Sequence, residues 1–192
     1  MAILKELIFL YNKFTLDRYK QRLIRKLKSQ CSEVNSELSE VESLFNQAVP
    51  LFCAAVDSYC KSNDFENPLN SLKDEKNDER QQFSSNVKSV YRKIAIETHP
   101  DKGAQDDKKL ELYNDANDAK KNQQIDKIIS IAKDLKIDLY DFNFEDIKLI
   151  EFSISETEDK INKIRSSYPW AWFFSTVKKR EDIISRFVLN KV

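Results

Sequence analysis

The sequence predicts an all-α protein. One glycine in 192 residues, where about 7% is usual, leaves few residues for tight hairpins, which disfavours a β-sandwich or barrel. Charged residues make up 33% of the chain and hydrophobic residues 41%, a balance typical of long solvated helices with narrow apolar seams. The 12 Phe, 7 Tyr and 2 Trp need a core, so disorder throughout is not expected.

Charge and cysteine content exclude several function classes. The 32 Lys and Arg balance the 32 Asp and Glu, giving a formal net charge of zero, which disfavours a strongly basic nucleic-acid binder. Cys31, Cys53 and Cys60 form no CxxC pair and the chain has one histidine, so we expect no zinc site, no other metal and no cofactor. Reduced thiols indicate a cytoplasmic protein, or a virion-associated one if a virus encodes it.

The first residues form an amphipathic stripe. Ile3, Leu7, Leu10 and Phe14 recur at helical spacing, and we expect this stripe to pack against the rest of the protein; binding to a membrane surface is the alternative. Charged residues at positions 5 and 6 interrupt the apolar run, so neither a secretory signal nor a membrane span is expected.

A heptad seam follows, completing an N-terminal helical region over residues 1–60. Its apolar members are Ile24, Leu27, Cys31, Val34, Leu38, Val41, Phe45 and Ala48. The segment starts basic and becomes acidic, which indicates a solvated helix face, with a nucleic-acid groove as the weaker alternative. Pro50 is predicted to end or kink the helix at about Val49, because its ring removes a backbone donor, and a shorter helix should cover residues 51–60.

Residues 61–82 are read as a charged linker, and residues 138–192 as a C-terminal helical pair. A second seam matches the first in length, so the two are expected to pair as antiparallel helices, within one chain or between chains; its members are Ile147, Ile150, Ile154, Thr157, Ile161, Ile164 and Tyr168. A short strand over residues 150–154 is the alternative there.

After Pro169 one final amphipathic helix is expected. The aromatic cluster should be core rather than a partner-binding surface; it comprises Tyr168, Trp170, Trp172, Phe173 and Phe174.

The most informative stretch lies between these seams, at residues 83–137. Val87, Val90 and Ile94 make one helical stripe, and Pro100 should end this helix at about Thr98 because proline disfavours helical backbone at the residue before it. A second helix should begin near Asp106 or Asp107, where the helix dipole favours acidic residues. Its positions 110, 113, 116 and 119 should face the first helix, and a third helix should cover residues 124–137.

Two antiparallel helices joined by His99, Pro100 and Asp101, as in YRKIAIETHPDKG followed by LELYNDAND, resemble the J domain of DnaJ-type co-chaperones. The resemblance covers residues 84–120 and matches the family's second and third helices. Residues 69–83 are the segment expected to supply a diverged first helix, as in auxilin-like J domains. The chain has neither a Gly/Phe-rich segment nor a cysteine repeat, which resembles the class defined by the J domain alone.

The resemblance implies a non-enzymatic partner-binding site. In the family the His-Pro-Asp loop docks on a DnaK-type chaperone and stimulates its ATP hydrolysis. The residues implied here are Lys88, Tyr91, Arg92, Lys93, His99, Pro100, Asp101 and Lys102. Their cations would meet an acidic surface on the chaperone, and the Asp101 carboxylate would meet an arginine.

Two functions therefore follow as expectations. The first is a co-chaperone whose flanking helices target an unknown client or assembly. The alternative is a structural or adaptor protein, for instance a viral or phage assembly component, in which the heptad helices bind and the hairpin is a scaffold. Catalysis by His99 is not expected, because no nucleophile motif surrounds it.

Overall fold

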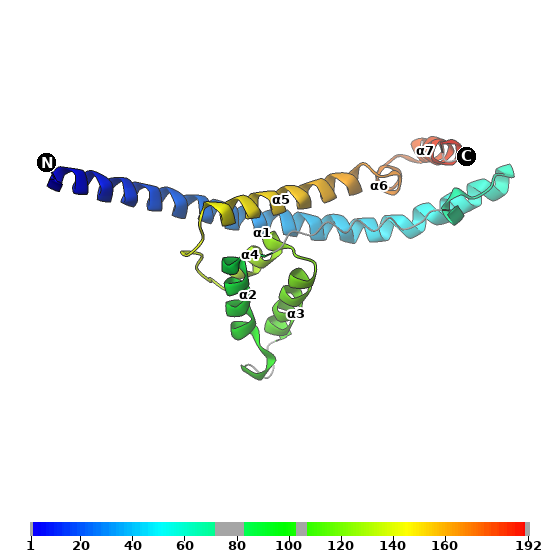
Figure 1. Cartoon of the computed structure of the whole chain (residues 1–192). Helices are drawn as coiled ribbons and strands as arrows, with labels where there is room; N and C mark the ends of the chain where they lie inside the picture. Colours follow the sequence, from blue (N-terminus) through cyan, green and yellow to red (C-terminus); the bar gives the residue numbers. More distant parts are fainter. Residues whose placement is uncertain (1, 72–82, 103–106, 191–192) are drawn as a thin grey trace. The chain divides into compact units, whose positions relative to one another are not determined.

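The computed structural model describes residues 2–71, 83–102 and 107–190, with side chains described from residue 14 onward except for Ser71 and Lys102. The described residues contain helices and no strand, which confirms the all-α prediction. The helices are α1 (Ala2–Asn63), α2 (Ser85–Thr98), α3 (Asp107–Lys121), α4 (Ile125–Asp134), α5 (Phe144–Arg165), α6 (Tyr168–Phe173) and α7 (Val177–Leu189), with the 3₁₀ turns η1 (Pro68–Ser71) and η2 (Pro100–Lys102) (Figure 1). None of the described helices has the length and apolar character that crossing a membrane requires.

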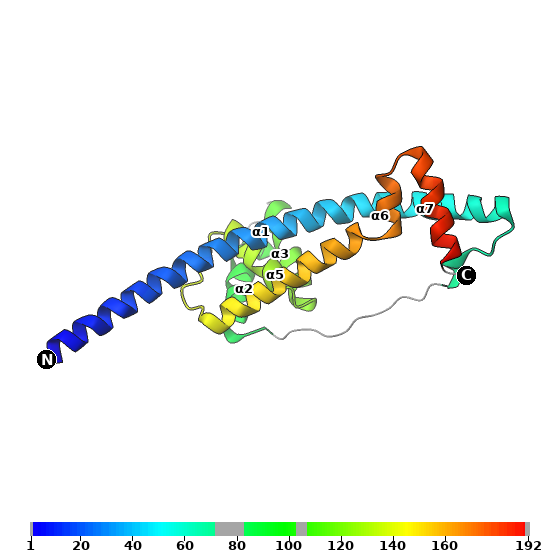
Figure 2. The same ribbon diagram turned by 90° about the horizontal axis from the view of Figure 1, so that it is seen from above.

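The chain forms two compact units, each assembled from two separate segments. Unit 1 contains residues 1–35 and 80–156, and unit 2 contains residues 36–79 and 157–192. Helices α1 and α5 each contribute one part to each unit. Figure 2 shows the course of both helices. The alternative of a strand at residues 150–154 is wrong, because these residues lie within α5.

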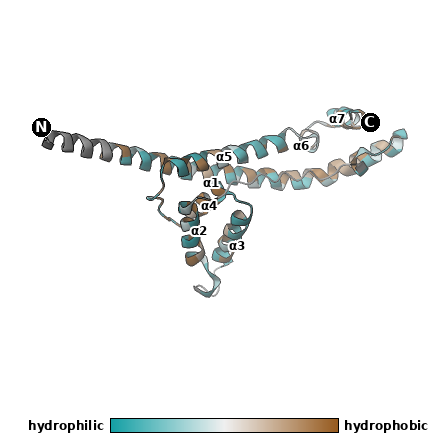
Figure 3. Cartoon of the chain, viewed as in Figure 1, coloured by the Kyte–Doolittle hydropathy of each residue, from teal (hydrophilic) through white to brown (hydrophobic). Residues whose placement is uncertain are grey.

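The core of unit 1 is built from five helices. Ala116 and Ala119 are buried on α3, and their small side chains let α2 approach closely. Hydrophobic and hydrophilic residues alternate along α2 and α3 (Figure 3), as expected for helices that bury one face. The largest buried groups of the other helices are Ile24, Leu27, Cys31 and Val34 on α1, Val87, Val90 and Ile94 on α2, Ile125, Ile128 and Ile129 on α4, and Ile147, Ile150 and Ile154 on α5.

A buried polar centre joins α1, α4 and α5 within unit 1. The Asp126 carboxylate accepts a hydrogen bond from Asn35 Nδ2 at 3.0 Å and another from Ser153 Oγ at 2.8 Å. Asp126 is 1% exposed, and these donors offset part of the cost of burying its charge. Burial, and secondarily the Asp126 charge, raise the pKa of the Cys31 thiol.

This environment predicts the order of cysteine reactivity. At pH 8 we expect iodoacetamide to modify half-buried Cys53 first, because burial raises the pKa of Cys31 and of Cys60 and withholds their thiolates. Peptide mass mapping over a time course measures the three rates, and the same reaction in urea, where all three should react together, is the control. Equal rates in the folded protein would contradict the buried placement of Cys31 and Cys60.

Unit 2 surrounds a cluster of aromatic rings. Phe52 of α1 meets the Trp172 ring of α6 at 5.9 Å and the Phe187 ring of α7 at 5.2 Å, both edge to face. Val56, Cys60, Ile184 and Val188 complete the buried cluster. Trp172 is therefore core, as predicted, whereas Phe174 is 57% exposed.

Within unit 2 the two seams pair inside one chain and run antiparallel. Glu42 pairs with Lys160 at 2.5 Å, and Glu37 pairs with Arg165 at 2.7 Å. Residue numbers therefore fall along α5 as they rise along α1, so the two helices are antiparallel. Leu38, Val41 and Ile161 of the two seams are buried within this single chain.

Helix α1 continues through Pro50, so the predicted end at about Val49 and the separate helix over residues 51–60 are wrong. Pro50 lacks the N–H that would donate to the carbonyl of Asn46, a change that costs about 3 kcal/mol within a helix. Phe52 and Val56 are 1% and 0% exposed, and burying a ring and a branched side chain there offsets a cost of that size.

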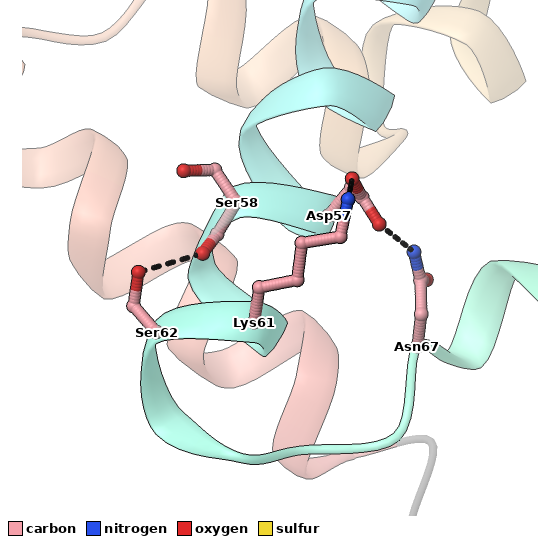
Figure 4. Close-up of polar contacts among 5 residues, drawn as sticks. All are labelled: Asp57, Ser58, Lys61, Ser62 and Asn67. Atoms are coloured by element: carbon pink, nitrogen blue, oxygen red, sulfur yellow. Dashed lines mark hydrogen bonds and ion pairs between the residues drawn. The ribbon is translucent and has the colours of Figure 1, made fainter.

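The end of α1 is fixed by local polar contacts (Figure 4). Lys61 Nζ lies 2.7 Å from Asp57 Oδ2, and Asn67 Nδ2 donates to Asp57 Oδ1 at 3.4 Å. The hydrogen bond from Lys61 holds the pKa of Asp57 below its usual value. Asp64 follows with φ of 57°, a left-handed residue of the kind that stops a helix. Of the predicted linker, residues 61–63 are helical, and residues 72–82 lie outside the described residues.

The C-terminal segment folds as two helices instead of the one predicted. Residues 174–176 separate α6 from α7, and Pro169 occupies the first turn of α6, as expected. Arg180 of α7 donates to the carbonyls of Trp172 and Phe173 at 3.2 and 3.0 Å, and its guanidinium lies 4.7 Å from the Trp172 ring centroid. This side chain satisfies carbonyls at the end of α6, so the chain can turn there.

Candidate partner-binding site

The candidate site lies on the hairpin formed by α2, η2 and α3 in unit 1. Helix α2 begins at Ser85, and the preceding Ser84 is its N-cap: the Ser84 hydroxyl accepts a hydrogen bond from the backbone N–H of Val87 at 3.2 Å. It ends at Thr98, as predicted, because His99 has an extended backbone with φ of −58° and ψ of 131° before Pro100. Helix α3 begins at Asp107, also as predicted.

Contacts between α2 and α3 fix the hairpin as antiparallel. Tyr91 Oη donates to Asn117 Oδ1 at 2.7 Å, and Lys120 Nζ lies 4.5 Å from the Tyr91 ring centroid. At the other end the His99 ring meets the Tyr113 ring at 5.7 Å, edge to face. Tyr91 is half-buried, so its ring is both part of the helix contact and accessible from outside.

The loop presents its acid to solvent. The Asp101 side chain is 87% exposed and that of His99 is 44% exposed, while Pro100 is exposed. His99 Nδ1 lies 3.3 Å from the Asp101 backbone nitrogen, which donates to it, and 3.5 Å from Asp101 Oδ2. The imidazole therefore holds the loop turn from inside, against Tyr113, while the carboxylate remains accessible.

Cations lie on the outer surface of α2. Lys88, Arg92 and Lys93 are all exposed; the first two are one turn apart and share a face, with Lys93 about 100° further round. Ile96, 54% exposed, continues the face of Lys88 and Arg92 by one more turn. Lys102 lies in η2, and its side chain is outside the described part of the chain.

The partner residues on α3 differ in part from the predicted ones. Ala116 and Ala119 are buried and Tyr113 is half-buried, as expected, but Leu110 is 46% exposed. Leu110 lies in the first turn of α3. Asn117 and Lys120, which hold Tyr91, were missed; their only sequence signal is the helical spacing from Tyr113.

The base of the hairpin is anchored by a buried carboxylate. Asp146 of α5, 2% exposed, accepts hydrogen bonds from Ser84 Oγ at 2.6 Å, Asn86 Nδ2 at 2.7 Å and the Asn143 backbone nitrogen at 2.9 Å. Three donors on one carboxylate make a strong, directional junction. The start of α2 is thereby tied to the start of α5.

Removing this anchor should loosen the whole hairpin. We expect Asp146→Ala to lower the free energy of unfolding by roughly 2 kcal/mol, because buried donors on Ser84 and Asn86 lose their acceptor. Urea unfolding followed by circular dichroism measures the loss. Asp141→Ala, which removes an exposed carboxylate nearby, is the matched control and should change stability by less than about 0.5 kcal/mol. Similar losses in both variants would mean that the three hydrogen bonds contribute little.

No family model matches the chain, and searches of curated proteins and of solved structures return no match. The described residues contain no group of three or more His, Cys, Asp or Glu side chains placed to hold a metal.

Proposed function

We propose that this chain is a co-chaperone that binds a DnaK-type ATPase and stimulates its ATP hydrolysis through His99, Pro100 and Asp101. The observation that carries the proposal is the exposed Asp101 carboxylate on a turn that closes an antiparallel helical hairpin. A carboxylate held on a short turn suits a bidentate contact with a partner arginine. The resemblance to J domains supplies the partner class.

The surface of the hairpin supports recognition rather than catalysis. His99 contacts Tyr113 and the backbone of its own loop. Among the described hydrogen bonds, none joins His99 to a nucleophilic side chain. Exposed Lys88, Arg92 and Lys93 would steer a negatively charged partner surface toward the loop and fix its register. The flanking helices would bring the recruited ATPase to a client or assembly.

A single-turnover assay tests the proposal. ATP preloaded on a DnaK-type chaperone should be hydrolysed faster when the full chain is added, and no acceleration at saturating chain would contradict the proposal. The assay uses a panel of DnaK-type chaperones from several sources, and at least one of them should be stimulated.

Replacing the α2 cations should weaken binding to the chaperone in a salt-dependent way. We expect Lys88→Ala/Arg92→Ala/Lys93→Ala to raise the concentration needed for half-maximal stimulation by about tenfold at low salt, with a smaller difference at high salt, because screening already removes the steering there. Lys148→Ala/Lys163→Ala/Lys178→Ala removes the same charge at exposed positions outside the hairpin and should have little effect. Equal losses in both triple variants would indicate a general charge effect.

A further inference from the structure

One segment of α1 is uncovered on every side. The six consecutive residues 14–19 are all exposed, and six residues span more than a full helical turn. Phe14 is 59% exposed, Leu16 53% and Tyr19 59%. The prediction that Phe14 packs against the rest of the protein is therefore wrong. The first residue of this helix that is buried among described side chains is Ile24.

The same part of α1 carries cations without balancing acids. Residues 14–28 hold six Lys and Arg and one acid, Asp17. Lys20 and Lys28 point toward the protein and donate to the backbone carbonyls of Tyr140 and Ile137. The remaining four, Arg18, Arg22, Arg25 and Lys26, are exposed.

These four cations fall on the helix face opposite the core. At 100° per residue, buried Ile24 and Leu27 mark one side of the helix, and the four cations cluster on the other within about 100° of one another. Phe14 and Tyr19 border this arc, and the Arg18 guanidinium lies 5.1 Å from the Phe14 ring centroid. We call Phe14, Arg18, Tyr19, Arg22, Arg25 and Lys26 the cationic face.

Some exposed cations elsewhere in the described residues are paired with carboxylates. Examples are Lys61 with Asp57, Lys160 with Glu42 and Arg186 with Asp182. No described ion pair involves the four cations of the cationic face. A local positive potential on a chain of zero net charge indicates a partner that carries the opposite charge.

We infer that the cationic face binds the surface of an anionic lipid bilayer, with α1 lying in the plane of the headgroups. Exposed rings beside arginines suit the interface, where rings reach the upper acyl region and guanidinium groups meet phosphates. The sequence before Phe14 continues the apolar repeat with Ile3, Leu7 and Leu10. A nucleic acid would also attract the cations, but its phosphate backbone would not bury a run of aliphatic side chains at helical spacing.

Membrane binding is independent of the proposed chaperone activity and would determine where that activity occurs. The experiment is co-sedimentation of the full chain with vesicles of phosphatidylcholine containing one-third phosphatidylserine, and with vesicles of phosphatidylcholine alone. We expect binding to the anionic vesicles at low salt, at least tenfold weaker binding to the neutral ones, and a marked loss at high salt.

Two variants separate the contributions. Arg18→Gln/Arg22→Gln/Arg25→Gln/Lys26→Gln should weaken binding to anionic vesicles at least tenfold, because each cation near such a surface contributes about fivefold. Phe14→Ser/Tyr19→Ser should weaken it severalfold without changing the salt dependence. Lys148→Gln/Lys163→Gln/Lys178→Gln/Lys179→Gln has the same net charge as the first variant, at exposed positions elsewhere, and should bind like the native chain.

The inference is overturned if the native chain binds neutral and anionic vesicles equally, if it binds neither, or if the charge-matched control loses as much binding as the cationic-face variant. Tighter binding to an oligonucleotide duplex, measured by fluorescence anisotropy and unaffected by Phe14→Ser/Tyr19→Ser, would also overturn it and assign the face to nucleic acid. Stimulation of a DnaK-type ATPase in the absence of lipid should be the same for native and cationic-face variants, so failure of one proposal is distinguishable from failure of the other.

Discussion

Asp101→Asn and His99→Gln should each abolish stimulation of a DnaK-type ATPase while leaving the fold intact. Asn keeps the size of the Asp101 side chain but removes the charge, and with it the charge-assisted contact with a partner arginine that an amide cannot replace. Asp101 is 87% exposed, so its loss costs the folded chain little. Single-turnover hydrolysis should return to the rate of the chaperone alone.

The His99 variant tests a different part of the same loop. Gln lacks the ring that contacts Tyr113 at 5.7 Å and the Nδ1 atom that accepts from the Asp101 backbone nitrogen, so the turn loses the contacts that hold it. Asp107→Asn, an exposed acid at the start of α3, is the matched control and should stimulate like the native chain. Native rates for both loop variants would leave the hairpin as a scaffold and favour the adaptor alternative.

Phe52→Ala should cause the largest loss of stability of any single truncation in unit 2. The ring is 1% exposed and meets both Trp172 and Phe187 edge to face. Truncating a buried Phe to Ala typically costs 3–5 kcal/mol, from lost burial together with the cavity that remains. Because the same packing offsets the missing hydrogen bond at Pro50, we also expect reduced helicity around that residue.

Chemical unfolding followed by circular dichroism and by tryptophan fluorescence measures this loss. Both tryptophans of the chain, Trp170 and Trp172, lie in α6, so fluorescence reports on unit 2. Leu51→Ala removes a neighbouring side chain that is 53% exposed and should cost less than about 1 kcal/mol. Comparable losses at positions 51 and 52 would contradict the packing described for the aromatic cluster.

Local signals allowed the sequence to predict the hairpin well. Pro100 restricts the residue before it, so the end of α2 at Thr98 followed from sterics within three residues. The acid at Asp107 and the apolar spacing likewise marked the start of α3. Such features depend on neighbours in sequence, which is why their positions could be predicted without coordinates.

Features that depend on distant residues could not be predicted in this way. Just after Pro50 in the continuous helix α1, Phe52 packs against Trp172 and Phe187, more than a hundred residues away. The break after Phe173 depends on Arg180 reaching back to two carbonyls. The anchoring of α2 depends on Asp146, which in the sequence is one acid among many. Phe14 and Leu110 are exposed, and a periodic pattern does not reveal whether another element covers a given position.

The interleaving of the two units sets an order of events during synthesis. Unit 1 needs residues 80–156 to join residues 1–35, and unit 2 needs residues 157–192 to join residues 36–79. While the ribosome is still translating the middle of the message, the apolar seam of the first helix has emerged without its partners, and neither core can close. Contacts between segments so distant in sequence slow folding and leave hydrophobic surface exposed for longer. The nascent protein itself would therefore be a substrate for the kind of chaperone that it is proposed to recruit.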